Sequence, residues 1–292
     1  MRTLIFFLLT LCFVTDAQCQ DASTKGDNAE LAQMYKEDQA DRTPGTLIDF
    51  EKMAERDRER EARVYEMLDQ GLVKTSNDYA NAAMIFQHGN DTVASGMAVK
   101  MMYKAVELDS TRSKWLLAAA IDRDLMYRNK PQIYGTQYRR MEGGKWELYK
   151  IDKNAVTDAE RRAYNVPSLE ETNVRLKRMN SKQIMELYDS GKTVDEIVGF
   201  IRKHQATNSG YDLSEDAVNN FGYMLMGKGE DKEALKVFQL NVQLHPKAYN
   251  PWDSYGEILL KLGRKEEAAE AYEKSLLLNP QNNNAKEVLK NM

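Results

Sequence analysis

The sequence repeats at a fixed interval near its C-terminus. Within residues 215–282, residues of one kind recur 34 positions apart, and the pairs are Gly222 and Gly256, Gly229 and Gly263, Ala234 and Ala268, Phe238 and Tyr272, and Pro246 and Pro280. This period is typical of a helix–turn–helix unit that stacks on its neighbours. The residue types fit such a unit, because small residues let two helices approach closely and a proline after the second helix cannot continue it. The repeat therefore restricts this part of the chain to a stack of helical hairpins.

The repeated residues resemble the tetratricopeptide repeat family. The family pattern has a tryptophan, a Leu-Gly pair, a large apolar residue, and then glycine, alanine, an aromatic residue, alanine and proline. It is matched by Trp252, Gly256, Leu259, Gly263, Ala268, Tyr272 and Pro280. The sequence departs from the pattern at Tyr255 and Ser275, where leucine and alanine are usual. The resemblance implies a short α-solenoid, with one repeat at 215–248 and a second at 249–282.

The segments on either side of the two repeats are predicted to cover the ends of the stack. Residues 181–214 are predicted to form a degenerate helix pair around Gly191, with Phe200 at the position of the aromatic plug. Residues 283–292 are predicted to supply a final helix. Repeat stacks need such caps, because an end repeat would otherwise expose an apolar face to water.

The composition is that of a globular protein. The chain has 292 residues, of which 42% are apolar and 29% are charged, and this length allows two modest domains with cores of their own. The formal net charge is −4, and Lys and Arg alternate with Asp and Glu along the helix faces. A nucleic-acid-binding protein normally concentrates basic residues on one face. We therefore expect no nucleic-acid partner.

Residues 1–19 have the features of a secretory signal peptide. Arg2 precedes an apolar run from Leu4 to Val14, which is too short to span a bilayer stably. Small residues at Ala17 and Cys19 favour cleavage before Gln20. We therefore predict a periplasmic or secreted protein without a membrane span. Lipid anchoring at Cys19 is the alternative, although Asp-Ala-Gln is a poor lead-in to a lipidated cysteine.

Cleavage of the signal peptide would remove both cysteines from the mature chain. Both cysteines, Cys12 and Cys19, lie in the segment that would be removed. The mature chain would then have no disulfide, no thiolate nucleophile and no cysteine-ligated metal. Residues 20–30 are polar and are predicted to be a loose lead-in.

Residues 31–178 are predicted to form a helical domain. Apolar residues recur at the helical period in segments near 31–42, 47–69, 77–88, 92–107 and 112–128. Gly143-Gly144, followed by the alternating Trp146 and Leu148, predicts a small β-hairpin near 137–149. Capping boxes at Thr157…Glu160 and Ser168…Glu171 predict two short helices after it. The predicted fold is all-α, with one small hairpin and a C-terminal solenoid.

Several carboxylates in this domain fall on helix faces that are otherwise apolar. Asp122 lies four residues from both Ala118 and Met126, so a helix places it on the face of those residues. Burying an unpaired carboxylate costs several kcal/mol, so each such group needs an arginine, a hydrogen-bond cluster or a metal. The other inward carboxylates are Asp38 and Asp57, and the arginines near enough in sequence to pair with the three are Arg42, Arg58 and Arg123.

Short polar motifs occur in a fixed order through the same region. They are Asp38, Gln39 and Arg42; Gln87, His88 and Asp91; Asp122 and Arg123; Gln132, Tyr134, Gly135, Thr136 and Gln137; and Asp158 and Arg161. The set covers about residues 28–175 and resembles an uncharacterised bacterial domain family, known only as a domain of unknown function. The resemblance implies a mainly helical fold and no established activity. Helical domains of this kind also occur fused to tetratricopeptide repeats.

Three interpretations of these polar residues stay open. One is a buried network that fixes helix register, made of Asp38, Arg42, Asp57, Gln87, His88, Asp122, Arg123, Gln132, Thr136 and Gln137. The second is a ligand pocket without catalysis. The third is an enzyme, most plausibly a hydrolase of cell-envelope material, with an acid–base or metal site around His88, Asp91 and Asp122, and with Arg123 and Gln137 positioning the substrate. The prediction leans toward a protein that is not an enzyme, with no cofactor and no bound metal.

The repeats offer a separate candidate surface. Concave faces rich in tyrosine and asparagine are where such repeats bind peptides. The predicted groove residues are Asn219, Asn220, Tyr223, Trp252 and Tyr255. We therefore predict a protein or peptide partner for this groove. The alternative is that the two repeats only stabilise the first domain by packing on it.

Overall fold

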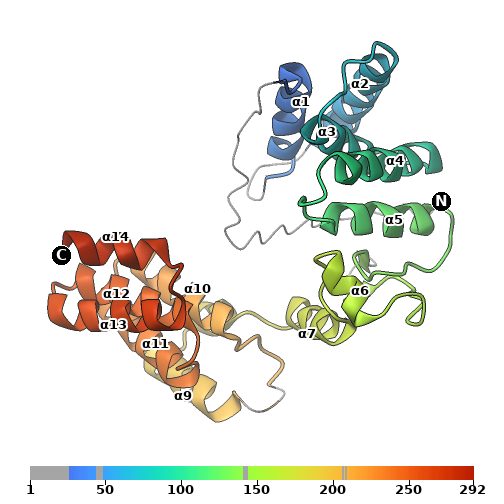
Figure 1. Ribbon diagram of the computed structural model, residues 1–292. Helices are drawn as coiled ribbons and strands as arrows, with labels where there is room; N and C mark the ends of the chain where they lie inside the picture. The colour runs from blue at the N-terminus through green and yellow to red at the C-terminus, as the bar shows by residue number, and fades with distance from the viewer. Residues whose placement is uncertain (1–25, 44–48, 141–143, 206, 208) are drawn as a thin grey trace. The chain divides into compact units, whose positions relative to one another are not determined.

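The computed structural model describes residues 26–43, 49–140, 144–205, 207 and 209–292. Within them the chain forms fourteen helices and one two-stranded hairpin, which confirms the predicted fold class. It divides into two compact units between Lys177 and Arg178 (Figure 1). No helix in the described ranges is long and apolar enough to cross a membrane. The predicted signal peptide at 1–19 and most of the lead-in lie outside the described residues.

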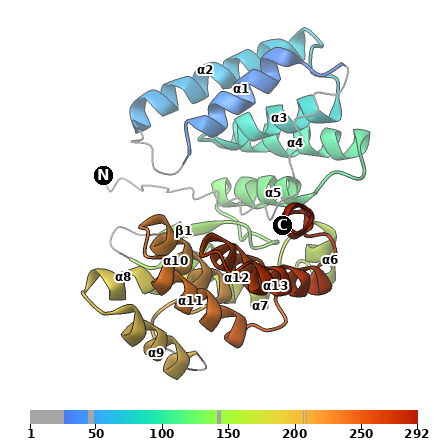
Figure 2. The same ribbon diagram turned by 90° about the vertical axis from the view of Figure 1, so that its left-hand side faces the viewer.

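Five helices build the core of the N-terminal unit. They are α1 (Ala29–Ala40), α2 (Phe50–Asp69), α3 (Ser76–Gln87), α4 (Thr92–Leu108) and α5 (Trp115–Tyr127). Helix α3 packs on α4 and α4 on α5, as Figures 1 and 2 show. Phe86, Met102 and Leu117 fill the space between them and are fully buried. Asp91 caps the start of α4 through its carboxylate.

The hairpin and two further helices complete this unit. Strand β1 (Tyr138–Arg140) pairs antiparallel with β2 (Trp146–Leu148), at the place the sequence predicts, while residues 141–143 of the turn lie outside the described residues. Helix α6 (Asp158–Ala163) begins at the capping box of Thr157 and Glu160. In the second predicted box, which opens α7 (Leu169–Met179), the backbone N–H of Ser168 donates to Glu171 and that of Glu171 donates to Ser168.

The C-terminal unit is a series of helical hairpins. Its helices are α8 (Ile184–Asp189), α9 (Val194–His204), α10 (Glu215–Gly227), α11 (Asp231–Leu244), α12 (Tyr249–Lys261), α13 (Lys265–Leu278) and α14 (Asn283–Asn291). Helices α10 and α11 form one hairpin, and α12 and α13 form the next, 34 residues later (Figures 1 and 2). In α9, Ile197 and Ile201 are the fully buried side chains, whereas Phe200 is half-buried against Tyr211 and His204. Phe200 therefore does not match the buried plugs of the repeats.

Close approach of the paired helices explains the repeated glycines. A Cβ atom at Gly222 would lie 2.7 Å from the ring of Phe238, and one at Gly256 would lie 3.0 Å from the ring of Tyr272. Both rings are fully buried. Each glycine therefore leaves the space that the aromatic ring of the second helix occupies.

Candidate functional site

Asp122 of α5 anchors the loop that precedes β1. The side chain is fully buried. Its Oδ1 accepts the backbone N–H groups of Ile133 (2.8 Å) and Tyr134 (2.9 Å). Its Oδ2 accepts those of Gly135 and Thr136 (both 2.9 Å) and the Thr136 hydroxyl (2.8 Å). The amides converge because Gly135 takes a positive φ of 92°, a conformation that suits glycine. The carboxylate is thus paired with hydrogen-bond donors and not with Arg123, which the sequence offers as its partner.

Other buried groups hold the same loop from its remaining sides. The Gln132 side chain accepts from the backbone N–H of Gln137 and donates to the carbonyl oxygens of Gln137 and Tyr149, each at 2.9 Å. Arg161, which is 1% exposed, donates to the carbonyl oxygens of Tyr134 (3.1 Å) and Ile133 (3.0 Å). In the sequence, Arg161 stands out only as part of the family pattern. The loop residues to which it donates lie 27 and 28 positions earlier in the chain, and no local sequence pattern indicates these bonds.

A second polar cluster joins α1, α2 and the end of α3. Asp38 is 1% exposed, and its Oδ1 accepts from Arg42 (2.8 Å) and from His88 Nδ1 (2.9 Å). Its Oδ2 accepts from the Gln39 amide at 2.7 Å. Arg42 also donates to Asp57 at 2.6 Å. The structure thus brings together four of the predicted polar residues.

Two arginines that the sequence analysis overlooked extend this cluster. Arg60, which is 7% exposed, donates to Asp41 at 2.6 Å and to Asp57 at 3.3 Å. Arg56 holds Asp41 with two bonds of 2.8 Å. Burial opposes ionisation of Asp41, but the bonds from the two arginines outweigh it and lower the pKa of that carboxyl. Arg58, the predicted partner, is exposed and makes no ion pair within the described ranges.

His88 is held as a neutral imidazole. The bond to Asp38 requires a hydrogen on Nδ1, because an ionised carboxylate can only accept. Burial lowers the pKa of His88, although its bond to Asp38 acts in the opposite direction. Nε2 therefore carries a lone pair at neutral pH, and it has no hydrogen-bond partner in the part of the chain that the structure describes.

Arg123 of α5 lies between this cluster and the loop. It is 4% exposed and donates through Nη1 to the carbonyl oxygen of Gln87 and through Nε to the Gln137 side chain at 3.4 Å. No carboxylate among the described residues lies within ion-pair distance of it. Burial lowers the pKa of Arg123 to about 10, so the guanidinium keeps its charge at neutral pH.

The predicted acid–base group is not one cluster of mutually bonded side chains. His88 bonds Asp38, and Asp122 bonds the loop. Asp91 accepts the backbone N–H groups of Val93 and Ala94, both at 2.8 Å, as the cap of α4. The described residues contain no group of three or more His, Cys, Asp or Glu that could hold a metal ion.

The predicted groove residues lie on α10 and α12 in different surroundings. Asn220 is exposed, and Asn219 is 6% exposed and accepts from Asn241 at 3.4 Å. The Tyr223 hydroxyl joins the two helices, with bonds to Glu257 (2.7 Å) and Ser254 (3.1 Å). Trp252 and Tyr255 lie edge to face, 6.5 Å apart, and pack on the core around Leu259 and Tyr272. Their rings therefore serve packing between the hairpins.

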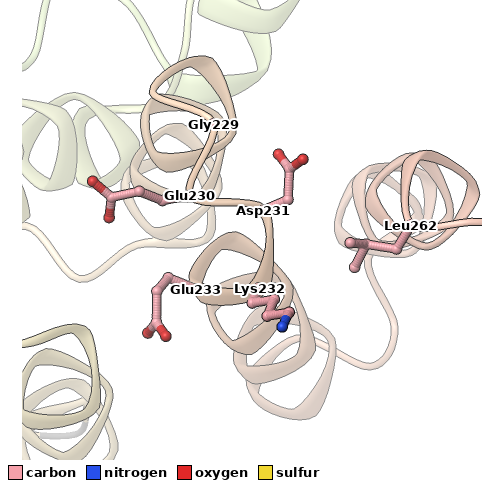
Figure 3. A pocket seen from close by; sticks show the side chains of 6 residues that line it. All are labelled: Gly229, Glu230, Asp231, Lys232, Glu233 and Leu262. Atoms are coloured by element: carbon pink, nitrogen blue, oxygen red, sulfur yellow. The ribbon is translucent and has the colours of Figure 1, made fainter.

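A shallow hollow of about 410 Å³ lies at the turn between α10 and α11. Its lining is Gly229, Glu230, Asp231, Lys232, Glu233 and Leu262, and Figure 3 shows Leu262 reaching toward Asp231 from the end of α12. Glu230 accepts from the Tyr188 hydroxyl (2.6 Å), and Asp231 is paired with Lys261 (2.6 Å). None of the predicted site residues lines this hollow.

Comparisons with known proteins bear on the repeats. Residues 250–282 match the family described as the tetratricopeptide repeat. No curated protein matches the sequence of this chain.

Similar solved structures include YrrB, described as a tetratricopeptide protein with an unusual peptide-binding site, at 14% identity and a TM-score of 0.27 over 77% of this chain and 97% of that one. They also include MamA, at 13% identity and a TM-score of 0.23 over 87% and 94% of the two chains. For yeast Tom70 the values are 14% identity and a TM-score of 0.32, over 92% of this chain and 58% of Tom70.

The sequence match covers α12, α13 and the residues that join them to α14, which is the second of the two hairpins with a 34-residue interval. In that hairpin Gly256 faces Tyr272, and Ala268 is fully buried, as the family pattern requires. Residues 250–282 of this helical protein therefore form a tetratricopeptide repeat.

Proposed function

We propose that the protein is exported and acts without catalysis, by binding an extended segment of a partner protein through the first helices of its C-terminal hairpins. Tetratricopeptide repeats are protein-interaction modules built of stacked helices. In such a stack, the first helices of successive hairpins lie next to one another and present one continuous face. Here these helices are α10, α12 and α14.

One set of side chains on these helices supports the proposal. Positions three and seven residues apart share a helix face, and the 34-residue interval carries each position into the next hairpin. We call the resulting set the first-helix stripe, and its members are Asp216, Asn219 and Tyr223 of α10, Asn250, Asp253 and Glu257 of α12, and Asn284, Glu287 and Asn291 of α14. Four members are carboxylates and four are amides, while none is Lys or Arg. The stripe is therefore acidic and rich in groups that bind peptide backbone.

The innermost carboxylates of the first-helix stripe are paired with neutral donors. Asp253 accepts from the amides of Asn282 (2.7 Å) and Asn284 (2.9 Å), and Glu257 accepts from the Tyr223 hydroxyl. Neither makes an ion pair with a described residue. At the end of the stripe, Asp216 lies 3.7 Å from Arg178.

Several carboxylates elsewhere in the same unit have basic partners. Asp195 is paired with Lys236 (2.8 Å), Asp231 with Lys261 (2.6 Å) and Glu267 with Arg264. The centre of the stripe thus carries negative charge that is not paired with any basic side chain among the described residues. Charge complementarity then favours a partner segment with Lys or Arg side chains, whose backbone the asparagine amides can hydrogen-bond.

The test is peptide binding by the mature full-length chain. We expect lysine- and arginine-containing peptides to bind and acidic peptides of equal length to fail. Replacing Asp253 by Asn together with Glu257 by Gln is expected to weaken binding of the basic peptides at least about tenfold, since two charges are lost while the shape is kept. The affinity is measured by fluorescence anisotropy at two ionic strengths, because screening should weaken it.

The matched control removes two charges from the second helix of the same repeat. Glu266→Gln with Glu270→Gln on α13 is expected to leave peptide affinity unchanged, because both side chains are exposed outside the stripe. Equal loss of binding in the two double variants, or equal binding of acidic and basic peptides, contradicts the proposed surface.

Export is the second part of the proposal, and it is supported by the apolar run from Leu4 to Val14 and by the small residues before Gln20. N-terminal sequencing of protein recovered from outside the cytoplasm is expected to begin at Gln20. A chain that starts at Met1 contradicts cleavage. A lipid on Cys19 supports anchoring instead.

Acid–base chemistry is the alternative function, and one observation favours it. The bond from His88 to Asp38 orients a neutral imidazole, which is the state of a general base. Of the residues predicted for a hydrolase of envelope material, Asp91 and Asp122 have structural bonds of their own. A hydrolase would therefore use His88 together with Asp38. This function is favoured if the wild-type protein turns over an envelope substrate and the His88→Gln variant does not.

A further inference from the structure

Arg123 is a buried cation without a counter-ion among the described residues. Its surroundings differ from those of the other buried arginines in the same unit, because Arg60 is paired with two carboxylates and Arg161 donates to three carbonyl oxygens and to Asp158. Arg123 donates to two neutral oxygens. Burying a charge is costly unless it is paired, so this arrangement favours an anion that comes from outside the chain.

Two nitrogen atoms at this place have bonding capacity left over. Nη2 of Arg123 and Nε2 of His88 have no hydrogen-bond partner within the described ranges. Arg123 is 4% exposed and the His88 side chain is 5% exposed, and neither nitrogen is among the completely buried polar atoms that lack a partner. Oε1 of Gln87, the residue before His88, is completely buried and has no partner. Unpaired polar groups of this kind are rare in protein interiors.

The two nitrogens belong to residues that lie close together. His88 follows Gln87, and the carbonyl oxygen of Gln87 accepts from Arg123. The positive charges of Arg42 and Arg123 both help to lower the pKa of His88, which places the three in one electrostatic neighbourhood. Three carboxylates belong to the same neighbourhood. Asp38 accepts from Nδ1 of His88, Glu61 of α2 lies beside Gly89, and Asp91 caps the start of α4.

We propose that Arg123 Nη2 and His88 Nε2 together bind an oxyanion, the carboxylate or phosphate group of a small ligand, and that a proton taken from solvent onto Nε2 accompanies binding. The guanidinium is suited to both groups, because its planar donors match their oxygens. A neutral Nε2 would direct a lone pair at the anion, whereas the protonated form donates a hydrogen bond. We call this place the Arg123–His88 site.

Because anion binding takes up a proton at His88, the direction in which the anion affinity changes with pH can be predicted. In the free protein, burial keeps the pKa of His88 below its ordinary value. A bound anion favours the charged imidazolium and raises that pKa. Affinity should therefore increase as pH falls from the His88 pKa of the bound protein toward that of the free protein. The same linkage means that the free protein loses stability as pH falls below the ordinary histidine value of about 6.5, because the unfolded chain then binds the extra proton.

The experiment is an NMR titration of the three histidines in the mature full-length chain, with sodium phosphate in one series, sodium acetate in a second, and chloride at equal ionic strength as the reference. We expect one of the two oxyanions to raise the pKa of His88 by about one unit, which corresponds to about tenfold tighter binding to the protonated form. The ring signals of His204, at the end of α9, serve as the control and should not respond to the choice of anion. The series that gives the shift identifies phosphate or carboxylate as the ligand group.

Variants assign the shift to the site. Arg123→Gln is expected to abolish it, and Arg123→Lys to weaken anion binding at least about tenfold, since lysine lacks the planar fork. His88→Gln lacks the imidazole signal, so its anion binding is followed by isothermal titration calorimetry at several pH values; it should still bind the anion but lose the pH dependence. Arg139→Gln is the control, because Arg139 of β1 is an exposed arginine paired with Glu147.

An unchanged His88 pKa in both oxyanion series overturns the proposal, as does an Arg123→Gln chain that keeps the full shift. If Arg123→Gln does not fold, Arg123→Lys and His88→Gln carry the test. The Arg123–His88 site is in the N-terminal unit, so its failure would leave peptide binding by the first-helix stripe unaffected.

Discussion

Asp122→Asn is expected to lower the free energy of unfolding of the N-terminal unit by about 3–5 kcal/mol. The wild-type carboxylate accepts five hydrogen bonds from consecutive residues of one loop and is fully buried. Asparagine has nearly the same shape but only one acceptor oxygen, and its NH2 group would point at donors. At least two backbone N–H groups of the loop would then remain buried without an acceptor, which is the costly outcome.

Urea denaturation followed by tryptophan fluorescence measures this loss. A Trp252→Phe background leaves Trp115 and Trp146, which both belong to the N-terminal unit. The control is Asp124→Asn, two residues further along α5, where the carboxylate is partly exposed and bonds Arg128 and Ser95. That change is expected to cost at most about 1 kcal/mol. Equal midpoints for Asp122→Asn and wild type would show that the loop does not depend on this carboxylate.

Asp38→Asn is expected to lower the free energy of unfolding of the same unit by about 3 kcal/mol. The carboxylate holds Arg42 and His88 at the junction of α1 and α3, and it is 1% exposed. Removing its charge leaves the Arg42 guanidinium with one carboxylate partner among the described residues, Asp57, and with the backbone carbonyl oxygen of residue 38. Breaking a buried ion pair by neutralising one partner is strongly destabilising, because the remaining charge stays away from water.

The same urea experiment reports the result, with Glu30→Gln as the control. Glu30 lies on α1 as well, but its partner Arg63 is a surface side chain, so a much smaller change is expected. If Asp38→Asn unfolds at the wild-type urea concentration, the cluster adds nothing to stability. Its buried charges would then have to be explained by a role in binding or catalysis.

The two clusters differ in what they leave for function. Asp122, Gln132 and Arg161 form hydrogen bonds to the backbone of one loop, and these bonds occupy most of the donor and acceptor groups of the three side chains. They account for a rigid loop. The side chains of His88 and Arg123 also contribute structural bonds, yet each keeps one nitrogen unbonded among the described residues. For this reason the proposed oxyanion site lies at these two residues.

Much of the fold was predictable from short stretches of sequence. The spacing of Gly222, Phe238 and their counterparts predicts the helical hairpins, because close packing of two helices is a local requirement that each repeat must satisfy. The Gly-Gly turn predicts the hairpin of β1 and β2, and Thr157 with Glu160 predicts the start of α6. The burial of Asp122 also follows from the sequence, since a helical period places it on the apolar face of α5.

The partners of the polar side chains were decided by the tertiary structure. Asp122 meets backbone amides 11 to 14 residues away, and Asp38 meets a histidine 50 residues away. The ion pairs of Asp41 come from Arg56 and Arg60 of α2, while Arg58 is exposed to solvent, since each residue along a helix rotates the side chain by about 100°. Sequence periodicity depends on neighbours within one or two turns, so it determines which face of a helix is buried. Which groups meet across that face depends on how the helices are rotated and spaced against each other, and only packing of the whole unit sets this.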